Sequence, residues 1–190
     1  MSALPHQPMT LAEFLAWEER QPLKYEFDGC RPVAMAGGTT AHARIQRNLA
    51  ISIGGRLIAK PCEFFGSDIK IEVAGRIRYP DGFVVCSRPT DDMTVHRDPV
   101  VIFEILSEGT ASRDVIVKNR EYAATPSVRR YVVLPQDYIG ASVFERIGDD
   151  WIGHVLDAEA TLKMPEIGIE VPLAELYRGV ELPPPLPPET

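Results

Sequence analysis

The apolar run "VVIFEIL", residues 100–106, constrains the fold more than any other stretch of this 190-residue chain. Apolar side chains at consecutive positions, rather than at alternate ones, are typical of a strand that is covered on both faces. Such a strand needs a packed layer on each side of its sheet. The run therefore predicts an α/β or α+β domain, with a mixed central β-sheet flanked by helices.

The segments around this run supply the expected helices and the other strands. Thr10 and Glu13 have the spacing of a capping box at the start of the first helix, and Asp28-Gly29 indicates a hairpin turn. The expected helices are 9–20, 41–59 and 112–125, the last ending before Pro126, and the expected strands and hairpins are 25–35, 63–73, 76–86, 99–107, 129–135, 141–156 and 166–177.

The order of these elements predicts a single domain over residues 10–180. Residues 1–9 form an N-terminal extension in this interpretation. The end of the chain, 181–190, is rich in proline, which favours a disordered, extended tail.

Composition and charge exclude some classes of protein. The formal net charge of −7 argues against nucleic-acid binding through a broad basic face, although it allows a local basic cleft. No stretch approaches the roughly 18 apolar residues of a membrane span, and the N-terminus lacks the features of a secretory signal. We therefore expect a cytoplasmic protein with no membrane partner.

The three cysteines, Cys30, Cys62 and Cys86, lie far apart in the sequence. An odd count without C-x-x-C spacing argues against a disulfide framework and against a zinc site. Free cysteine is among the most frequently buried residue types. The sequence therefore predicts three buried free thiols.

Glu104 is a charged residue inside the central apolar run. Glutamate is almost never fully buried without a partner, and burying an unpaired carboxylate costs several kcal/mol. Glu104 therefore needs a cation, a metal ion or a retained proton. The alternative is that it lies close enough to the end of its strand to reach water.

Asp81 is a second carboxylate at the start of an apolar segment, in "YPDGFVV". Pro-Asp-Gly is a strong turn signal, so Asp81 could serve the turn alone. The polar loop between the two segments suits neighbouring strands, which would bring Asp81 and Glu104 to one site. Paired carboxylates are good ligands for Mg²⁺, a hard ion that takes oxygen ligands and keeps several waters.

Lys118 follows on the next expected helix, at the border of the face that packs on the sheet. Val115 lies three residues before it and Tyr122 four residues after it. An ordinary surface pair of Lys118 with Asp114, one turn earlier, is the alternative interpretation.

The order of these residues resembles the PD-(D/E)XK nuclease superfamily, and more closely the Uma-two family of restriction-endonuclease-like proteins. The similarity runs from about Thr10 to Tyr177. The segments that carry it are "YEFDG" with Glu26, "HARIQRNL" with His42, "YPDGFVV" with Asp81, "VIFEILSEGTASRDVIVKNREYA" with Glu104, Asp114 and Lys118, and "PSVRRYVVL".

The chain departs from the family pattern in three places. Residues 107–110 read Ser-Glu-Gly-Thr where the family commonly has Ser-Pro-Ser-Thr, and residues 130–132 read Arg-Tyr-Val where it often has Glu-Tyr-Trp. The superfamily's lysine position, two after the glutamate, is Leu106, and a helix lysine, here Lys118, is expected to replace it.

The resemblance implies a restriction-endonuclease-like fold and Mg²⁺- or Mn²⁺-dependent hydrolysis of DNA. Asp81, Glu104 and the carbonyl of Ile105 would hold the metal, and Lys118 would orient the attacking water. Glu26 and His42 would complete the catalytic set, with a possible role for Asp114 in holding Lys118. The resemblance also implies a homodimer.

Candidate DNA contacts are the arginines near the expected cleft, namely Arg44, Arg47, Arg76, Arg78, Arg113 and Arg129.

Two other functions remain open at this stage. One is a binding or regulatory module that keeps the nuclease fold without cleaving nucleic acid. The other is a phosphate-ester hydrolase that uses "MAGGTTAHA" as an anion-binding loop before a helix, although the chain lacks the strand–GxxxxGK–helix pattern.

Overall fold

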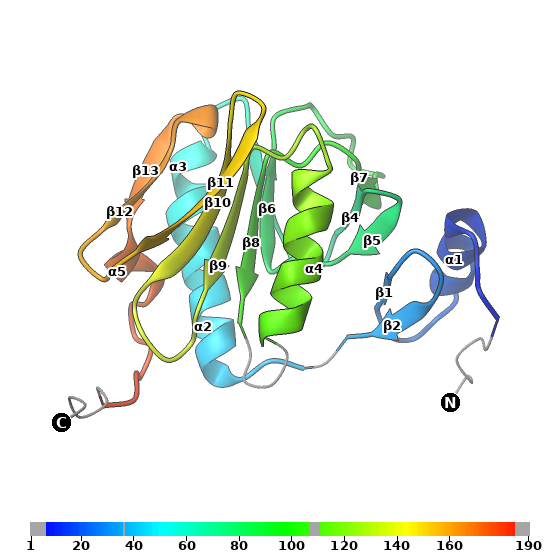
Figure 1. Cartoon of the computed structure of the whole chain (residues 1–190), viewed down its shortest axis with the longest axis horizontal. Coiled ribbons are helices and arrows are strands. Elements are labelled where there is room, and N and C mark those ends of the chain that lie inside the picture. Colours follow the sequence, from blue (N-terminus) through cyan, green and yellow to red (C-terminus); the bar gives the residue numbers. More distant parts are fainter. Residues whose placement is uncertain (1–6, 36, 107–110, 185–190) are drawn as a thin grey trace.

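The structure is a computed structural model, which describes residues 7–35, 37–106 and 111–184, with side chains omitted for 111–114. A mixed six-stranded sheet forms its centre (Figure 1), in the order β11-β10-β9-β8-β6-β3. Its strands are β3 Glu63–Gly66, β6 Gly82–Val85, β8 Val101–Ile105, β9 Arg130–Leu134, β10 Ala141–Ile147 and β11 Asp150–Leu156. This arrangement confirms the expected mixed α+β fold.

The predicted central strand is confirmed as β8. It pairs in parallel with β9 on one side and antiparallel with β6 on the other. All its residues are buried except Glu104, which is partly exposed. Helix α4, Ala111–Ala123, connects β8 to β9 across one face of the sheet.

Two helical layers cover the two faces of the central sheet (Figure 1). On one face lies a continuous helical segment made of α2 Thr40–Leu49, the π-helical turn η1 Ala50–Gly54 and α3 Gly55–Leu57. Its predicted stripe of Ile45, Leu49, Ile53 and Leu57 is buried against Phe103 and its neighbours. On the other face α4 packs through Tyr122 against residues such as Ile102 and Tyr131. Burial on both faces explains the unbroken apolar run of β8.

A smaller five-stranded sheet lies beside the central sheet, in the order β2-β1-β5-β4-β7. Its strands are β1 Tyr25–Phe27, β2 Pro32–Ala34, β4 Lys70–Val73, β5 Arg76–Arg78 and β7 Val95–His96. Helix α1, Leu11–Glu18, packs on it and begins with the predicted capping box of Thr10 and Glu13. The predicted hairpin at Asp28-Gly29 is confirmed as β1–β2.

Glu18 anchors α1 to the smaller sheet through a buried polar contact. Its carboxylate accepts hydrogen bonds from Lys70 Nζ at 2.6 Å and from the Tyr79 hydroxyl at 2.7 Å. All three side chains are at most 8% exposed. Because Tyr79 lies two residues before Asp81, this contact also restrains the segment that leads to Asp81.

Two segments expected to be single strands are each divided between the two sheets. Residues 63–73 form β3 in the central sheet and β4 in the smaller one, and residues 76–86 form β5 in the smaller sheet and β6 in the central one. The break at Pro80 is understandable because proline cannot donate a ladder hydrogen bond. Sequence periodicity alone does not show that a strand changes sheet.

The remaining elements close the fold next to α2. Strands β12 Thr161–Met164 and β13 Ile169–Pro172 form a hairpin with the short helix η2 Pro165–Ile167 between them, and helix α5 Leu173–Leu176 follows. Strand β12 was not expected from the sequence. Most of the proposed N-terminal extension and tail lies outside the described residues. None of the described helices is long and apolar enough to cross a membrane.

The prediction of three buried free thiols is wrong. Cys62 and Cys86 form a disulfide, and Cys30 is free and exposed. Cys62 directly precedes β3 and Cys86 directly follows β6. Since Glu63 pairs with Val85 across these antiparallel strands, the two cysteines lie opposite each other. The pairing depends on a strand register that cysteine spacing does not reveal.

Reduction of this disulfide should destabilise the protein. It joins residues 24 positions apart. A closed loop of this length lowers the conformational entropy of the unfolded chain, which stabilises the folded state by about 3 kcal/mol. We expect denaturant unfolding of the Cys62→Ser/Cys86→Ser variant to show a loss of that size, and Cys30→Ser to show little change. Equal unfolding free energies of the double variant and the wild type would show that the Cys62–Cys86 disulfide does not stabilise the protein.

Candidate active site

Asp81 lies where the chain passes from the smaller sheet to the central sheet, immediately before β6. Gly82 pairs with Phe103 across β6 and β8, so the antiparallel register places Asp81 opposite Glu104. The backbone N–H of Ile105 donates a hydrogen bond to Asp81 Oδ2 at 2.7 Å. The Asp81 side chain is thus held at the end of β8, and it is not limited to a role in the turn.

Gly82 allows the strand to begin directly after Asp81. A Cβ at this position would lie 2.6 Å from the ring of Phe64 on β3. A larger residue here would therefore force the Phe64 ring to move, which favours glycine in addition to the turn preference of Pro-Asp-Gly.

Helix α2 contributes two side chains to Asp81. His42 Nε2 lies 3.0 Å from Asp81 Oδ1, and this hydrogen bond raises the pKa of His42 against the opposing effect of burial. Gln46, one turn later, donates to the Asp81 carbonyl at 3.2 Å and to Ser67 Oγ at 2.8 Å. Thr39 caps the helix by accepting from the His42 N–H.

Glu104 has two hydrogen-bond donors from α4. Lys118 Nζ and the Tyr122 hydroxyl each lie 3.0 Å from Glu104 Oε1. Burial raises the pKa of Glu104 to about 7, and Lys118 opposes this effect while the charges of Asp81 and Glu26 add to it. A carboxylate inside an apolar strand was expected to need a partner, and Lys118 and Tyr122 are two such partners.

Burial also raises the pKa of Tyr122 well above its ordinary value. Its hydroxyl consequently remains a hydrogen-bond donor throughout the physiological pH range.

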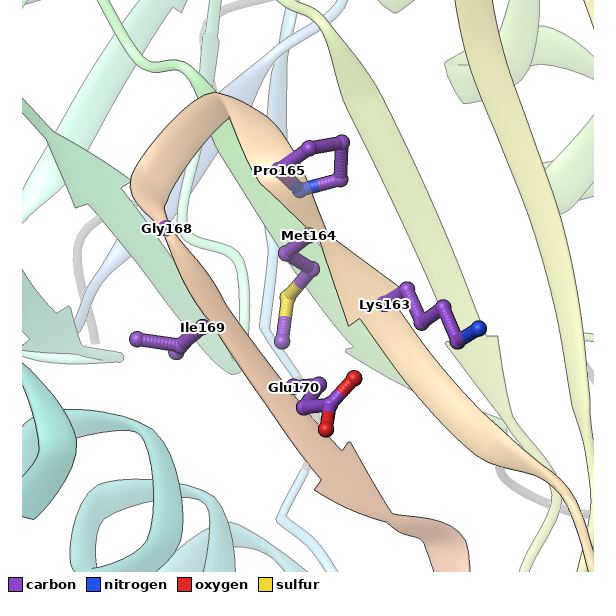
Figure 2. A pocket seen from close by; sticks show the side chains of 6 residues that line it. All are labelled: Lys163, Met164, Pro165, Gly168, Ile169 and Glu170. Atoms are coloured by element: carbon purple, nitrogen blue, oxygen red, sulfur yellow. The ribbon is translucent and has the colours of Figure 1, made fainter.

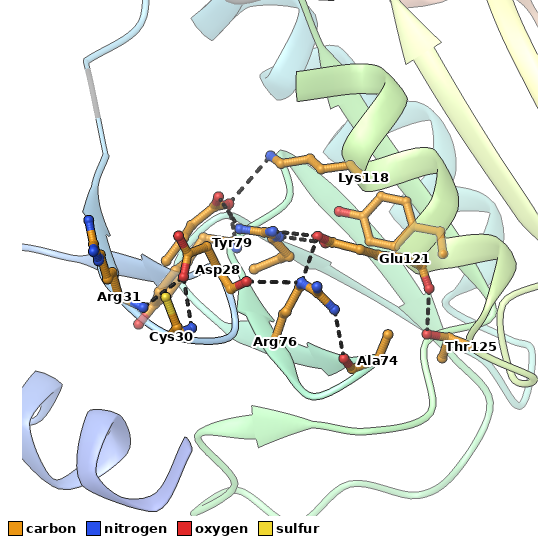
Figure 3. Close-up of polar contacts among 12 residues, drawn as sticks. Asp28, Cys30, Arg31, Ala74, Arg76, Tyr79, Lys118, Glu121 and Thr125 are labelled. Carbon is orange, nitrogen blue, oxygen red and sulfur yellow. Dashed lines mark hydrogen bonds and ion pairs between the residues drawn. The ribbon is translucent and has the colours of Figure 1, made fainter. Parts of the chain in front are cut away.

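Glu26 on β1 is a second carboxylate close to Lys118. Its Oε1 is 3.4 Å from Lys118 Nζ and accepts from the Tyr79 N–H at 3.2 Å. Its Oε2 accepts from Arg78 at 3.1 Å. Figure 3 shows Lys118 and Tyr79 in this network of polar contacts. Both oxygens of Glu26 therefore have partners in the protein, and Lys118 is one of them.

The donor set fits a hard divalent cation in part. Asp81, directly before β6, lies opposite Glu104 of β8. Burial and, to a lesser extent, the charges of Asp81 and Glu26 raise the pKa of Glu104, and a bound cation would offset both effects. Mg²⁺ commonly takes one or two carboxylates and completes its coordination with water. Among the described residues, however, no three His, Cys, Asp or Glu side chains form a metal-binding cluster.

The structure distinguishes among the arginines considered for DNA contact. Arg78 is 4% exposed and ion-paired inside the protein, and Arg76 contacts Glu121. Arg47 on α2 and Arg129 before β9 are exposed, whereas Arg44 on α2 is half-buried and lies 3.4 Å from Glu181. The side chains of Arg113 and Asp114 lie outside the described part of the chain.

Three residues of the site were missed in the sequence. Tyr122 was noted only as a packing residue and Gln46 was not considered, although Gln46 lies one helical turn after His42 and Tyr122 one turn after Lys118. Glu121, three residues after Lys118, was also missed. Helical spacing from a suspected site residue is the signal that could have identified all three.

A separate hollow of about 350 Å³ lies on the β12–β13 hairpin (Figure 2). It is lined by Lys163, Met164, Pro165, Gly168, Ile169 and Glu170. None of these residues contributes to the cluster around Asp81 and Glu104. The hollow is therefore not part of the candidate site.

The raised pKa of Glu104 predicts a pH-dependent stability in metal-free buffer. The folded protein binds this proton more tightly than the unfolded chain does, so the contribution of Glu104 is lost as pH rises from about 4.5 towards 7. The shift corresponds to about 3 kcal/mol. We expect the difference in unfolding free energy between wild type and Glu104→Gln to move by up to that amount, in favour of the variant, between pH 4 and pH 8. If this difference in unfolding free energy does not change with pH, the pKa of Glu104 is not raised in the folded protein.

Comparison with known proteins agrees with the fold. A crystal structure of "a putative nuclease belonging to DUF820" from Anabaena variabilis superposes with a TM-score of 0.75 at 18% identity, over 90% of this chain and 98% of that one. An uncharacterised protein of Synechocystis sp. is 29% identical over 181 residues, covering 93% of this chain and 95% of its own length. A second Synechocystis protein, also uncharacterised, is 28% identical over 150 residues, covering 76% of this chain and 85% of its own.

The family comparison covers most of the domain and agrees with the resemblance noted in the sequence. The Uma2 family, described as "Putative restriction endonuclease", matches residues 11–174, a range that includes Glu26, His42, Asp81, Glu104 and Lys118. The chain belongs to the Uma2 family.

Proposed function

We propose that this protein is a divalent-metal-dependent endonuclease that hydrolyses phosphodiester bonds of DNA. The observation that carries the proposal is the register of β6 and β8, which sets Asp81 opposite Glu104, with Lys118 in contact with Glu104. The description of the family and the name of its solved relative support a nuclease in general terms.

The carboxylates of Asp81 and Glu104, with the carbonyl of Ile105, would hold one Mg²⁺ or Mn²⁺. Such an ion lowers the pKa of a bound water and offsets negative charge on the phosphate. The Ile105 N–H fixes the Asp81 carboxylate through a 2.7 Å hydrogen bond. The donors on Glu104 Oε1 would hold that carboxylate in one orientation towards the ion.

The remaining residues orient groups and handle protons. Lys118 supplies positive charge beside Glu104 and would orient the attacking water or stabilise the charged transition state. His42, with its raised pKa, is a proton donor beside Asp81. Glu26, with an oxygen 3.4 Å from Lys118 Nζ, would help to hold that ammonium.

The same proposal extends to location and assembly. We propose a cytoplasmic protein, although disulfides such as Cys62–Cys86 are uncommon in reducing compartments. A homodimer would provide two sites for cutting both strands of a duplex. With a net charge of −7, DNA would be held by local contacts from accessible arginines and by the charge of the bound ion.

A second candidate function is a nuclease-fold module that binds a partner without cleavage. The observation that favours it is that side chains of the protein itself contact the acidic oxygens, Lys118 at Glu104 and His42 at Asp81. In such a module these contacts would stabilise the site in the place of a metal ion.

Cleavage of DNA in the presence of Mg²⁺ or Mn²⁺ tests the proposal directly. We expect purified protein to cut single- or double-stranded DNA, and Asp81→Ala and Glu104→Gln each to lower the rate by at least about 100-fold, as for other groups that stabilise a transition state. Glu170→Gln, on the distant β13, is the control and should cut as the wild type does.

Calorimetric titration with the metal separates the two candidate functions. We expect Mn²⁺ to bind the wild type and Glu170→Gln, and to bind Asp81→Ala much more weakly. Absence of both binding and cleavage in the wild type would support the binding module and reject the endonuclease.

A further inference from the structure

Arg78 is a buried cation behind the candidate site that the proposed mechanism does not use. It lies on β5 and is 4% exposed. Its guanidinium contacts Glu121 on α4 through two hydrogen bonds of 2.8 and 2.7 Å, and Glu26 on β1 at 3.1 Å. A buried arginine needs such partners because the loss of hydration is costly. Here the partners tie together three elements that meet beside the site.

Glu121 shares one face of α4 with Lys118, because three residues separate them. The two parallel hydrogen bonds between Arg78 and Glu121 restrict direction as well as distance, as is typical of arginine–carboxylate pairs. This contact therefore fixes the rotation of α4 relative to β5. The side chain of Lys118 is fixed with it, on the face that reaches Glu104.

Glu26 links Arg78 to Lys118 directly. Arg78 contacts one carboxylate oxygen of Glu26, and the other lies 3.4 Å from Lys118 Nζ. Lys118 lies closer to Glu104, at 3.0 Å. Without the charge of Arg78, Glu26 would attract the ammonium more strongly and draw it away from Glu104. Arg78 thus sets the balance between the two carboxylates that share Lys118.

Arg76 extends the same network towards the surface. Its Nε lies 3.0 Å from Glu121 Oε1, and it also donates to the carbonyls of Asp28 and Ala74. Figure 3 shows Arg76 between Glu121 and Ala74, and Thr125 at the far end of the network. Cationic and carboxylate side chains therefore alternate along the network, in the order Arg76, Glu121, Arg78, Glu26, Lys118 and Glu104.

We propose that Arg78 and Glu121 are positioning residues that hold Lys118 against Glu104, with Glu26 as the connecting carboxylate. The proposal rests on the proposed function for its effect on cleavage. Neither residue touches Glu104 or Asp81 in the described contacts, so both act through Lys118.

Arg78→Lys is the informative variant, because lysine keeps the charge but lacks the planar fork that contacts two carboxylates at once. Arg130→Lys is a matched control. Arg130 on β9 is also 4% exposed and contacts two carboxylates, Glu145 and Glu166, away from the site. Both variants should lose similar thermal stability.

Steady-state cleavage kinetics should distinguish the two variants. We expect Arg78→Lys to lower kcat by about 10- to 100-fold, as loss of a group that orients a site residue does, with KM within about 3-fold. Arg130→Lys should leave both constants near those of the wild type. An equal loss of kcat in the two variants would reduce Arg78 to a structural role and overturn the proposal.

A double-mutant cycle tests whether Arg78 acts through Lys118. In a Lys118→Met background, Arg78→Lys should change kcat less than about 2-fold, because residues that act as a unit are not additive. An undiminished effect in that background would show that Arg78 acts by another route, contrary to the proposal.

A spectroscopic measurement separates this proposal from the proposed function. The ammonium signal of Lys118 in ¹⁵N-lysine-labelled protein is assigned by its absence in Lys118→Met. We expect Arg78→Lys and Glu121→Gln to shift this signal and Arg130→Lys to leave it in place, whether or not the protein cuts DNA. An unchanged signal in Arg78→Lys and Glu121→Gln would overturn the positioning role, while failed cleavage with a shifted signal would reject only the endonuclease.

Discussion

The antiparallel pairing of β6 with β8 is the constraint on which the candidate site depends. It brings an aspartate that follows a proline opposite a glutamate in the central strand, and the N–H of Ile105 then fixes the aspartate. Each carboxylate is contacted from a different layer, His42 of α2 at Asp81 and Lys118 of α4 at Glu104. The two helices that bury the sheet are thus also the helices that supply side-chain partners to both carboxylates.

Carboxylates inside the domain need partners, and this need explains why so many other charged residues also lie inside it. Glu104 is tolerated in β8 because Lys118 and Tyr122 donate to it, and Lys118 is in turn shared with Glu26. Charges of this kind contribute little to net stability, since desolvation offsets much of their attraction. Their number and arrangement are better explained by the proposed chemistry, for which a fixed ammonium and two fixed carboxylates are required.

The sequence was sufficient for the central layers and for the proximity of Asp81, Glu104 and Lys118. The unbroken run of β8 and the stripe that contains Ile45 and Leu49 depend on local periodicity, and the contacts of Glu104 follow from the cost of burying its charge. Two features depend on long-range strand register, which sequence periodicity does not encode. They are the passage of the chain from the smaller sheet to the central sheet at Pro80 and the Cys62–Cys86 disulfide. The roles of Tyr122 and Gln46 required the positions of the helices.

The proposed chemistry requires Asp81 and Glu104 to share one divalent cation. Anomalous diffraction from a crystal of the protein soaked in Mn²⁺ would locate such an ion. We expect one strong peak within about 2.2 Å of an oxygen of each carboxylate, near the distances at which such ions bind oxygen. A fully soaked crystal with no peak there, and with the contacts of Lys118 to Glu104 and of His42 to Asp81 intact, would contradict the proposed chemistry.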